Sequence, residues 1–265
     1  MAPEPMTDPR SASPTAAAAT ALRPILGPAG RGLVLVPAFD EAERLGSVLS
    51  ELARHSAFDV LVVDDGSSDG TCEVARRHGA RCLRHPFNLG YGAALQTGYK
   101  YAARAGYEVV VQLDADGQHD PRFVPVLAER VLSGAVDACV GSRFLLGEGY
   151  IPPRLRRAGM ILFGYIASVV TGRRITDPTS GYQALSRRVF EYFQSDVFPT
   201  DYPDADMLIL LHRAGFRVEE RPVAMRPAPG GRSMHSGLRP LFYVFKMLLS
   251  ILVTLLREPP PRADA

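Results

Sequence analysis

Two aspartates stand directly after an apolar run in the middle of the chain. Residues 109–113 are rich in valine, as a buried strand often is, and Asp114 and Asp116 follow two positions apart. Side chains two positions apart along a strand point the same way, so both carboxylates can face one ligand. Such oxygen ligands suit Mg²⁺ or Mn²⁺ bound to a diphosphate, with Gln118 as a further ligand or the His119 imidazole as an alternative. We predict a metal site here, although an acidic turn has the same residue types.

A second apolar run also ends in acidic residues. Residues 60–63 lead into Asp64, Asp65 and Gly66. In open α/β sheets, ligands bind beyond the carboxyl ends of the strands, so two runs that end this way predict one shared site. We expect Asp64 and Asp65 to hydrogen-bond the base or ribose of a nucleotide whose diphosphate the metal holds. Asp69 has an ordinary alternative role as the cap of the following helix.

Alternating strands and helices are predicted to position these residues. Continuous apolar runs indicate the strands, and apolar residues at helical spacing indicate the helices between them. Asp40 and Glu43 have the spacing of a capping box at the start of the first helix. The order predicts an α/β fold with a largely parallel sheet flanked by helices and right-handed crossovers. The predicted strands are 33–36, 60–63, 82–83, 109–113, 138–140 and 217–224, and the predicted helices follow Asp40 and cover 71–78, 93–105, 122–132 and 207–214.

The second half of the chain contains two apolar helical stretches. An arginine-rich cluster at 154–157 precedes the first, and the second is 241–256. The second stretch falls short of the ~20 residues needed to span a bilayer. We therefore expect two amphipathic helices at the membrane interface, at about 153–170 and 238–257. Packing of both helices on the domain's own core is the alternative.

Composition sets bounds on the class of protein. A chain of 265 residues is long enough for one large domain, which we place at 31–237, with a disordered tail at 1–30 and a loose, proline-rich tail at 258–265. The net charge of +2 gives no support for a nucleic-acid partner. We expect no signal peptide at the start. The cysteines are odd in number and scattered, so we expect reduced core residues rather than a zinc site or disulfides: Cys72, Cys82 and Cys139.

Five short motifs occur in the same order as in a known family. They are Leu-Val-Pro-Ala-Phe-Asp-Glu-Ala at 35–42, Val-Val-Asp-Asp-Gly-Ser at 62–67, Asn-Leu-Gly at 88–90, Asp-Ala-Asp at 114–116 and Val-Gly-Ser-Arg at 140–143. Together they resemble the family 2 glycosyltransferases, which have the GT-A fold, and most of all their polyprenyl-phosphate (dolichol-phosphate mannose synthase-like) branch. The resemblance covers residues 32–257. It implies that the nucleotide sugar is bound by Pro37, Asp40, Glu41, Asp64, Asp65, Gly66, Asn88, Asp114, Arg226 and Ser233.

The resemblance also implies four catalytic residues: Asp116, Arg143, Arg157 and Asp206. A lipid phosphate is already charged and needs no base, so cationic side chains suit it as an acceptor. Arg143 and Arg157 match two arginines that hold the acceptor phosphate in the family, although Arg157 could equally contact lipid headgroups. A hydroxyl acceptor would need a base, for which Asp204 or Asp206 is available. Both aspartates have an alternative role as favourable charges at a helix N-terminus.

The sequence therefore predicts a metal-dependent, inverting glycosyltransferase that uses Mg²⁺ or Mn²⁺. It would move a hexose from a nucleoside-diphosphate sugar to polyprenyl phosphate at the cytoplasmic face of the membrane, with an integral-membrane partner carrying the product onward. The alternatives are transfer to a hydroxyl of a glycan or lipid-linked saccharide, and a non-catalytic nucleotide-sugar-binding scaffold. In the family, a segment similar to 177–183 lines the cleft. This chain departs from the family pattern at Gln183, Ile161 and Met234, where relatives carry Arg, Ser and Lys.

Overall fold

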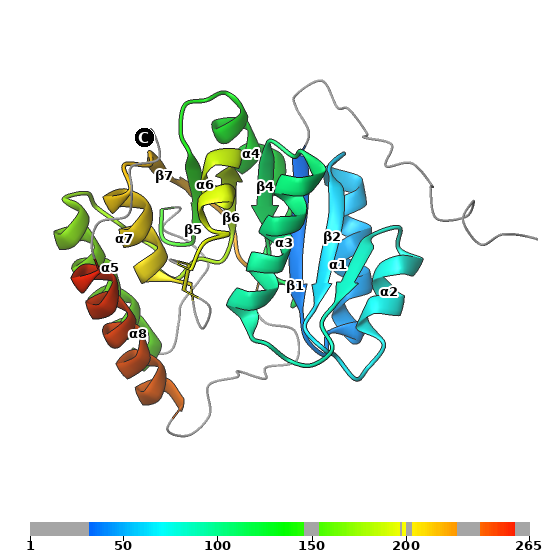
Figure 1. Ribbon diagram of the computed structural model, residues 1–265, viewed down its shortest axis with the longest axis horizontal. Helices are drawn as coiled ribbons and strands as arrows, with labels where there is room; N and C mark the ends of the chain where they lie inside the picture. Colours follow the sequence, from blue (N-terminus) through cyan, green and yellow to red (C-terminus); the bar gives the residue numbers. More distant parts are fainter. Residues whose placement is uncertain (1–31, 146–153, 197, 200–202, 227–238, 258–265) are drawn as a thin grey trace, which may run out of the picture.

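A sheet with helices on both faces forms the centre of the protein (Figure 1). The computed structural model describes residues 32–145, 154–196, 198–199, 203–226 and 239–257, and within them the sheet has seven strands in the order β3-β2-β1-β4-β6-β5-β7. Neighbouring strands are parallel except where β6 pairs with β4 and β5. The predicted mostly parallel α/β sheet is thus confirmed. The strands are β1 (Gly32–Ala38), β2 (Asp59–Asp64), β3 (Arg81–Arg84), β4 (Val109–Gln112), β5 (Ala138–Ser142), β6 (Gln183–Ser186) and β7 (Val218–Pro222).

Helices cover both faces of the sheet and create two cores. In β1, Leu33 and Leu35 belong to a cluster with side chains of α3, α6 and α7, whereas Val34 and Val36 belong to a cluster with side chains of α1, α2 and α4. This alternation follows from the two-residue period of a strand, and burial on both faces explains the continuous apolar run. The helices are α1 (Ala42–His55), α2 (Thr71–Arg77), α3 (Tyr91–Ala105), α4 (Val124–Leu132), α5 (Arg154–Thr171), α6 (Arg187–Tyr192), α7 (Ala205–Arg213) and α8 (Arg239–Leu256).

The strand β6 is not predicted by the sequence pattern, because Gln183–Ser186 has only four residues and polar residues at both ends. It is stabilised by lying antiparallel between two neighbours, with Leu185 opposite both Val110 of β4 and Ala138 of β5. Its first residue, Gln183, lies opposite the last residue of β4. The segment that precedes β6 is therefore brought to the carboxyl edge of the sheet.

The start of α1 is capped by a distant loop, and the predicted capping box of Asp40 and Glu43 is wrong. Glu41 occupies the N-cap position without a side-chain cap bond. Instead, side chains of the loop after β2 and of the first residue of α2 accept the hydrogen bonds of the backbone N–H groups of residues 40–42. The acceptors are Ser67 Oγ (2.9 Å), Thr71 Oγ1 (3.0 Å) and Asp69 Oδ2 (2.9 Å). This bonding joins the loops that follow β1 and β2 into one structure.

Two of the three cysteines form a disulfide, so the expectation of reduced core cysteines is wrong for them. Cys72 in α2 bonds to Cys82 in β3, with Cα atoms 5.7 Å apart. Their spacing of ten residues matches no recognised motif, and only the return of the chain from α2 to β3 brings them together. Cys139 is a free, buried cysteine, as predicted.

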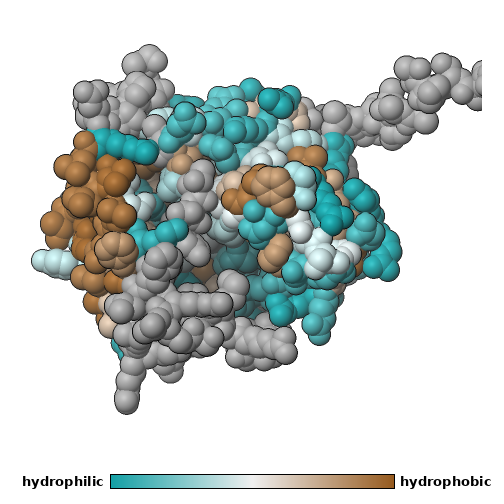
Figure 2. All heavy atoms as spheres, turned by 60° about the horizontal axis from the view of Figure 1, so that its bottom comes forward, coloured by the Kyte–Doolittle hydropathy of each residue, from teal (hydrophilic) through white to brown (hydrophobic). Residues whose placement is uncertain are grey.

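The two apolar stretches form helices that pack together against α7. Phe163 and Ala167 of α5 and Met247 and Ile251 of α8 share a small core with Ile209 of α7. The opposite sides of both helices carry apolar side chains that are more than half exposed, and Figure 2 shows the resulting patch over α5 and α8: Ile161, Tyr165, Val169, Phe245, Leu252 and Leu256. Within the described residues, every helix is too short or too polar to cross a bilayer. Both stretches are helical in the structure, and their role as interfacial helices stays a prediction. The tails at 1–30 and 258–265 lie outside the described residues.

Candidate active site

The predicted metal ligands lie in the loop that follows β4. The Tyr91 hydroxyl, at the start of α3, donates to Asp114 Oδ1 (3.0 Å). Asp116 accepts from the backbone N–H and the side-chain amide of Gln118, both at 2.9 Å. Burial and the charge of Asp114 raise the pKa of Asp116. The two carboxylates are therefore close enough to repel each other.

A third carboxylate, Glu41, approaches this pair from the end of β1. Burial raises the pKa of Glu41, and the charge of Asp116 adds to this, although a salt bridge to Arg44 (2.7 Å) opposes it. A divalent cation between the carboxylates would relieve this repulsion. The oxygens of Asp114, Asp116 and the Gln118 amide are hard ligands, so the residues present fit Mg²⁺ or Mn²⁺.

His119 supports the metal loop from inside the protein. The ring is buried, and its Nδ1 accepts the backbone N–H of Asp114 (3.0 Å). The neutral ring therefore carries its proton on Nε2, which lies 3.9 Å from Asp114 Oδ2. Burial lowers the pKa of His119, and the ring stacks on Tyr182 with centroids 4.8 Å apart. Because Nδ1 accepts the Asp114 N–H, His119 supports the backbone of the metal loop, and its alternative role as a metal ligand stays a prediction.

The acidic residues after β2 hold the neighbouring loops in place. Asp64 Oδ1 accepts the backbone N–H of Ser67 (2.9 Å). Asp65 accepts the backbone N–H groups of Leu89 (2.9 Å) and Gly90 (2.8 Å) and contacts His85 Nδ1 (2.7 Å). Both carboxylates are buried. Their contact with a base or ribose stays a prediction; the structure shows that they shape the rim of the site.

Gly66 permits a close approach between two loops of this rim. Its φ of +80° favours glycine, and a Cβ atom here would lie 2.6 Å from the carbonyl carbon of Phe87. Asn88, next along that loop, is exposed, as are the apolar side chains of Phe87, Leu89 and Phe39. Two other predicted donor-binding residues lie beside this loop: Pro37 of β1 pairs with Val63 of β2, and the Oδ1 of Asp40, after β1, accepts the Ser68 N–H (2.8 Å).

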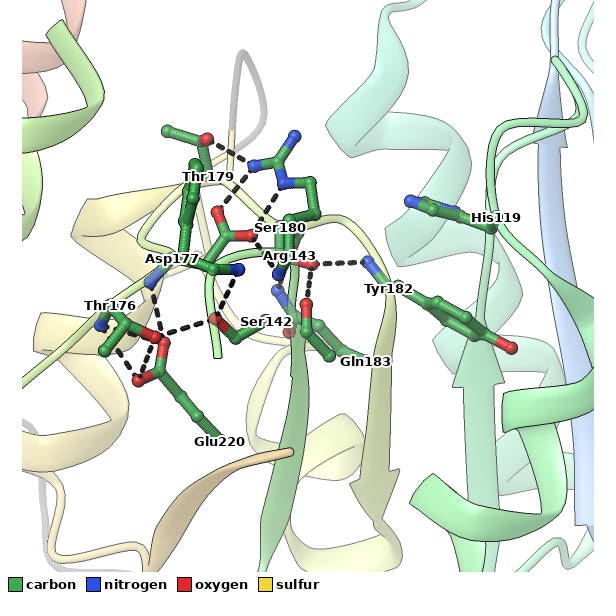
Figure 3. A network of polar contacts seen from close by, with 12 residues as sticks. His119, Ser142, Arg143, Thr176, Asp177, Thr179, Ser180, Tyr182, Gln183 and Glu220 are labelled. Carbon is green, nitrogen blue, oxygen red and sulfur yellow. Dashed lines mark hydrogen bonds and ion pairs between the residues drawn. The ribbon is translucent and has the colours of Figure 1, made fainter. Parts of the chain in front are cut away.

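Arg143 follows β5 and is held by the segment that precedes β6. Figure 3 shows its guanidinium bound in two places to Asp177, through Nε to Oδ2 (2.6 Å) and Nη2 to Oδ1 (2.5 Å), with a further bond from Nη2 to Thr179 Oγ1 (2.8 Å). The Arg143 backbone N–H also donates to Asp177 Oδ2 (2.9 Å). Both side chains are buried. Three side-chain bonds therefore fix the direction of this cation, and a fourth bond holds its backbone.

The arginine and the metal loop lie on two sides of one site. The charges of Arg143 and Asp177 both act on the pKa of His119, which binds the backbone of Asp114. Between them runs the segment that carries Gly181, where a Cβ atom would lie 3.1 Å from the Tyr91 hydroxyl and 3.5 Å from Asp114 Oδ2. The structure thus brings together the predicted residues Asp114, Asp116 and Arg143. It adds Tyr91, for which the sequence offers no local signal of a role, and it gives Asp177, from the segment that lines the cleft in the family, a specific partner in Arg143.

The two aspartates that were candidate bases are in contact, the Asp204 N–H donating to Asp206 Oδ1 (3.0 Å), but their surroundings differ. Asp206 is buried in α7, where it accepts from the Met207 N–H (2.8 Å) and from the Ser250 hydroxyl of α8. Burial raises the pKa of Asp206. A carboxylate enclosed between two helices does not fit the predicted catalytic role. Burial and the charge of Asp114 raise the pKa of the Tyr91 phenol, and the charge of Asp204 adds to this, so Asp204 lies near that phenol.

Arg226 and Arg157 are the remaining predicted residues that the structure describes. The Arg226 backbone N–H donates to the Gln118 carbonyl (2.8 Å), and its guanidinium pairs with Glu51 (2.6 Å) and Asp120 (3.4 Å), so Arg226 braces the metal loop. Arg157 is exposed in the first turn of α5. Ser233 lies outside the described residues.

Comparison with known proteins agrees with this arrangement. Residues 33–193 match the sequence model of the family described as Glycosyl transferase family 2. The chain is 31% identical over 216 residues to an undecaprenyl-phosphate mannosyltransferase of Micrococcus luteus, covering 78% of this chain and 88% of the relative. It is 33% identical over 223 residues to a polyprenol monophosphomannose synthase of Mycolicibacterium smegmatis, covering 79% and 83%.

A solved structure shares the fold. The glucosyl-3-phosphoglycerate synthase of Mycobacterium tuberculosis, in complex with Mn²⁺, UDP-glucose and phosphoglyceric acid, superposes with a TM-score of 0.65 at 22% identity, covering 85% of this chain and 79% of that one. This likeness confirms the GT-A fold that the sequence predicts. The family match over residues 33–193 and the two relatives above show that the chain belongs to glycosyl transferase family 2 and is an enzyme of its dolichol-phosphate mannose synthase-like branch.

Proposed function

We propose that the enzyme transfers a hexose from a nucleoside-diphosphate sugar to polyprenyl phosphate, with inversion, at the cytoplasmic face of a membrane. The observation that carries this proposal is the placement of opposite charges on two sides of one site. Asp114 and Asp116 provide carboxylates on one side, and Arg143 provides a fixed cation on the other. A metal-bound diphosphate suits the first, and an acceptor phosphate suits the second.

The donor side would bind both ends of the nucleotide sugar. Asp114, Asp116 and Gln118 would hold Mg²⁺ or Mn²⁺, which when bound neutralises the leaving diphosphate. The rim formed by the loops after β1, β2 and β3 would bind the nucleoside, through Pro37, Asp40, Glu41, Asp64, Asp65, Gly66 and Asn88. Arg226 and Ser233 would act on the diphosphate from the segment after β7. For Arg226 this requires a change of partner, because its guanidinium contacts Glu51 and Asp120.

The acceptor side favours a phosphate over a hydroxyl. A phosphate is ionised at neutral pH and can attack without a base, whereas a hydroxyl needs one. Asp206 is enclosed between α7 and α8, which removes one of the two candidate bases. Arg143 would hold the acceptor phosphate in line with the anomeric carbon, with Arg157 contributing from the start of α5. Direct attack from this position inverts the anomeric carbon.

A lipid acceptor also requires contact with a membrane. The exposed apolar side chains of α5 and α8 form one patch (Figure 2). Arg157 is exposed on α5, four residues before Ile161 of this patch. Apolar side chains that enter the lipid boundary next to a basic residue are typical of interfacial helices. The two curated relatives described above are named for transfer to polyprenyl phosphates, which supports the same acceptor class here.

The test combines acceptor and metal dependence in one assay. Purified protein is incubated with Mn²⁺, a panel of labelled nucleotide sugars and short-chain polyprenyl phosphate, and label in the lipid phase is counted. We expect transfer that is lost in Asp116→Ala and after removal of the metal with EDTA. The matched control is Asp196→Ala, because Asp196 is exposed and lies after α6, outside the site. Donor binding without lipid labelling would refute the polyprenyl-phosphate acceptor and direct the search to hydroxyl acceptors.

A further inference from the structure

Glu220 of β7 gives its carboxylate to the backbone of the segment that holds Arg143. Its Oε1 accepts the N–H of Asp177 (2.8 Å), and its Oε2 accepts the N–H (2.8 Å) and the hydroxyl (2.9 Å) of Thr176 (Figure 3). Among the described residues, Glu220 has no cationic partner. Its neighbour Glu219 differs, since it pairs with Arg130 (2.8 Å) and Arg221 (2.6 Å). The Glu220 charge is therefore used to anchor a loop.

The anchored loop leads directly to the acceptor side of the site. Asp177, whose N–H is held by Glu220, binds the backbone and the guanidinium of Arg143. Thr176 forms a hydroxyl contact with Ser142 (2.7 Å), the residue before Arg143. Two routes thus connect Glu220 to Arg143, one through Asp177 and one through Thr176 and Ser142. Hydrogen bonds to an ionised carboxylate are stronger than those between neutral groups, which suits an anchor.

We propose that Glu220 is a positioning residue for the acceptor phosphate. It acts through Asp177 on the direction of the Arg143 guanidinium and does not touch the substrate. The proposal rests on the proposed role of Arg143 as the acceptor-phosphate ligand. Because an Arg–phosphate pair depends on the angle between the two groups, a shift of Asp177 weakens acceptor binding and leaves the donor side unchanged.

The test compares two substitutions at Glu220 with the same substitutions at Glu219. Glu220→Ala removes all the anchoring bonds, whereas Glu220→Gln keeps the shape and removes the charge. We expect Glu220→Ala to raise the KM for polyprenyl phosphate about tenfold or more, as loss of bonds to a charged group would, and Glu220→Gln to raise it less. The KM for the nucleotide sugar should stay the same in both. Glu219→Ala and Glu219→Gln should leave both KM values unchanged.

Two further measurements separate positioning from general support of the fold. Amide hydrogen exchange at Thr176 and Asp177 should accelerate in Glu220→Ala and not in Glu219→Ala. Combining Glu220→Ala with Asp177→Asn should add little to the effect of Asp177→Asn alone, because both act through one contact. If Glu220→Ala folds poorly, the KM values of Glu220→Gln are compared with those of Glu219→Gln instead.

The outcomes distinguish this inference from the proposed function. Failure of the wild-type protein to label polyprenyl phosphate refutes the proposed function, whatever the variants do. Wild-type labelling with an unchanged acceptor KM in both Glu220 variants overturns the positioning role. Equal increases in the donor and acceptor KM values overturn it as well, because they indicate a general loss of structure.

Discussion

Replacing Phe245 by serine should weaken binding to lipid vesicles, because this side chain belongs to the exposed apolar patch of α5 and α8. Phe245 is 62% exposed although it lies on a helix whose other side is packed against the protein. A lipid surface would remove this exposed area from water. The chain offers a close control in Phe87, which is 63% exposed but lies on the rim of the nucleotide side.

The expected size of the effect follows from the exposed fraction. Complete burial of a phenylalanine side chain is worth about 1.5–3 kcal/mol. For a side chain that has roughly three-fifths of its area left to bury, the loss is about 1–2 kcal/mol. Since every 1.4 kcal/mol is a tenfold change in affinity, Phe245→Ser should weaken vesicle partitioning by about 5- to 25-fold.

Co-sedimentation with vesicles of anionic phospholipid would measure this effect at low and high salt. Phe245→Ser should lower the bound fraction at both salt concentrations, because the lost contribution is apolar. Phe87→Ser should bind as the wild type does. Equal partitioning of Phe245→Ser and wild type, or an equal loss in Phe87→Ser, would refute the assignment of this patch to the membrane.

Three further predictions concern stability and the site. Asp206→Asn should keep transfer activity and gain stability. Burial raises the pKa of Asp206, so the stability of the wild type falls as pH rises from the ordinary pKa of 3.8 through the raised pKa, and asparagine avoids that loss. Thermal melts from pH 3 to pH 8 should show a difference in Tm between the variant and the wild type that widens with pH. Gly66→Ala should lower the free energy of unfolding in urea by about 2 kcal/mol or more. Gly79→Ala, with a similar φ of +78° but open space for a Cβ atom, should lower it by less. Equal decreases in the two variants would exclude the clash with Phe87. Reduction of the disulfide should lower the free energy of unfolding by about 3 kcal/mol, the loop-closure value for a ten-residue spacing, and a reductant should not affect Cys72→Ser.

Features that depend on neighbours in the chain could be predicted from the sequence. The run of residues 109–113 identifies β4 because a strand buried on both faces is apolar throughout. Alternation of strands and helices implies parallel strands, whose carboxyl ends meet at one edge. For this reason the acidic residues after β2 and β4 could be expected at one site before any contact was known.

Roles that depend on contacts across the chain could not be predicted in this way. Asp177 is separated by 34 residues from Arg143 and by 43 from Glu220, so no periodic pattern connects them. The cap of α1 comes from residues about 30 positions away, which is why the local capping-box pattern is misleading. Asp204 and Asp206 are equivalent by their spacing at the start of α7. Only the packing of α8 against α7 encloses one of them.

The sequence alone therefore determined the family, the order of the elements from β1 to β5 and the position of the carboxylates after β4, because these depend on short motifs and local periodicity. The tertiary structure decided which charged side chains are fixed by partners, which are enclosed and which remain exposed. Burial and hydrogen bonding set the pKa of a carboxylate and the direction of an arginine, and both depend on residues far apart in the chain. The support of Arg143 by Glu220 is the clearest case, since β7 meets the segment before β6 only in the folded protein.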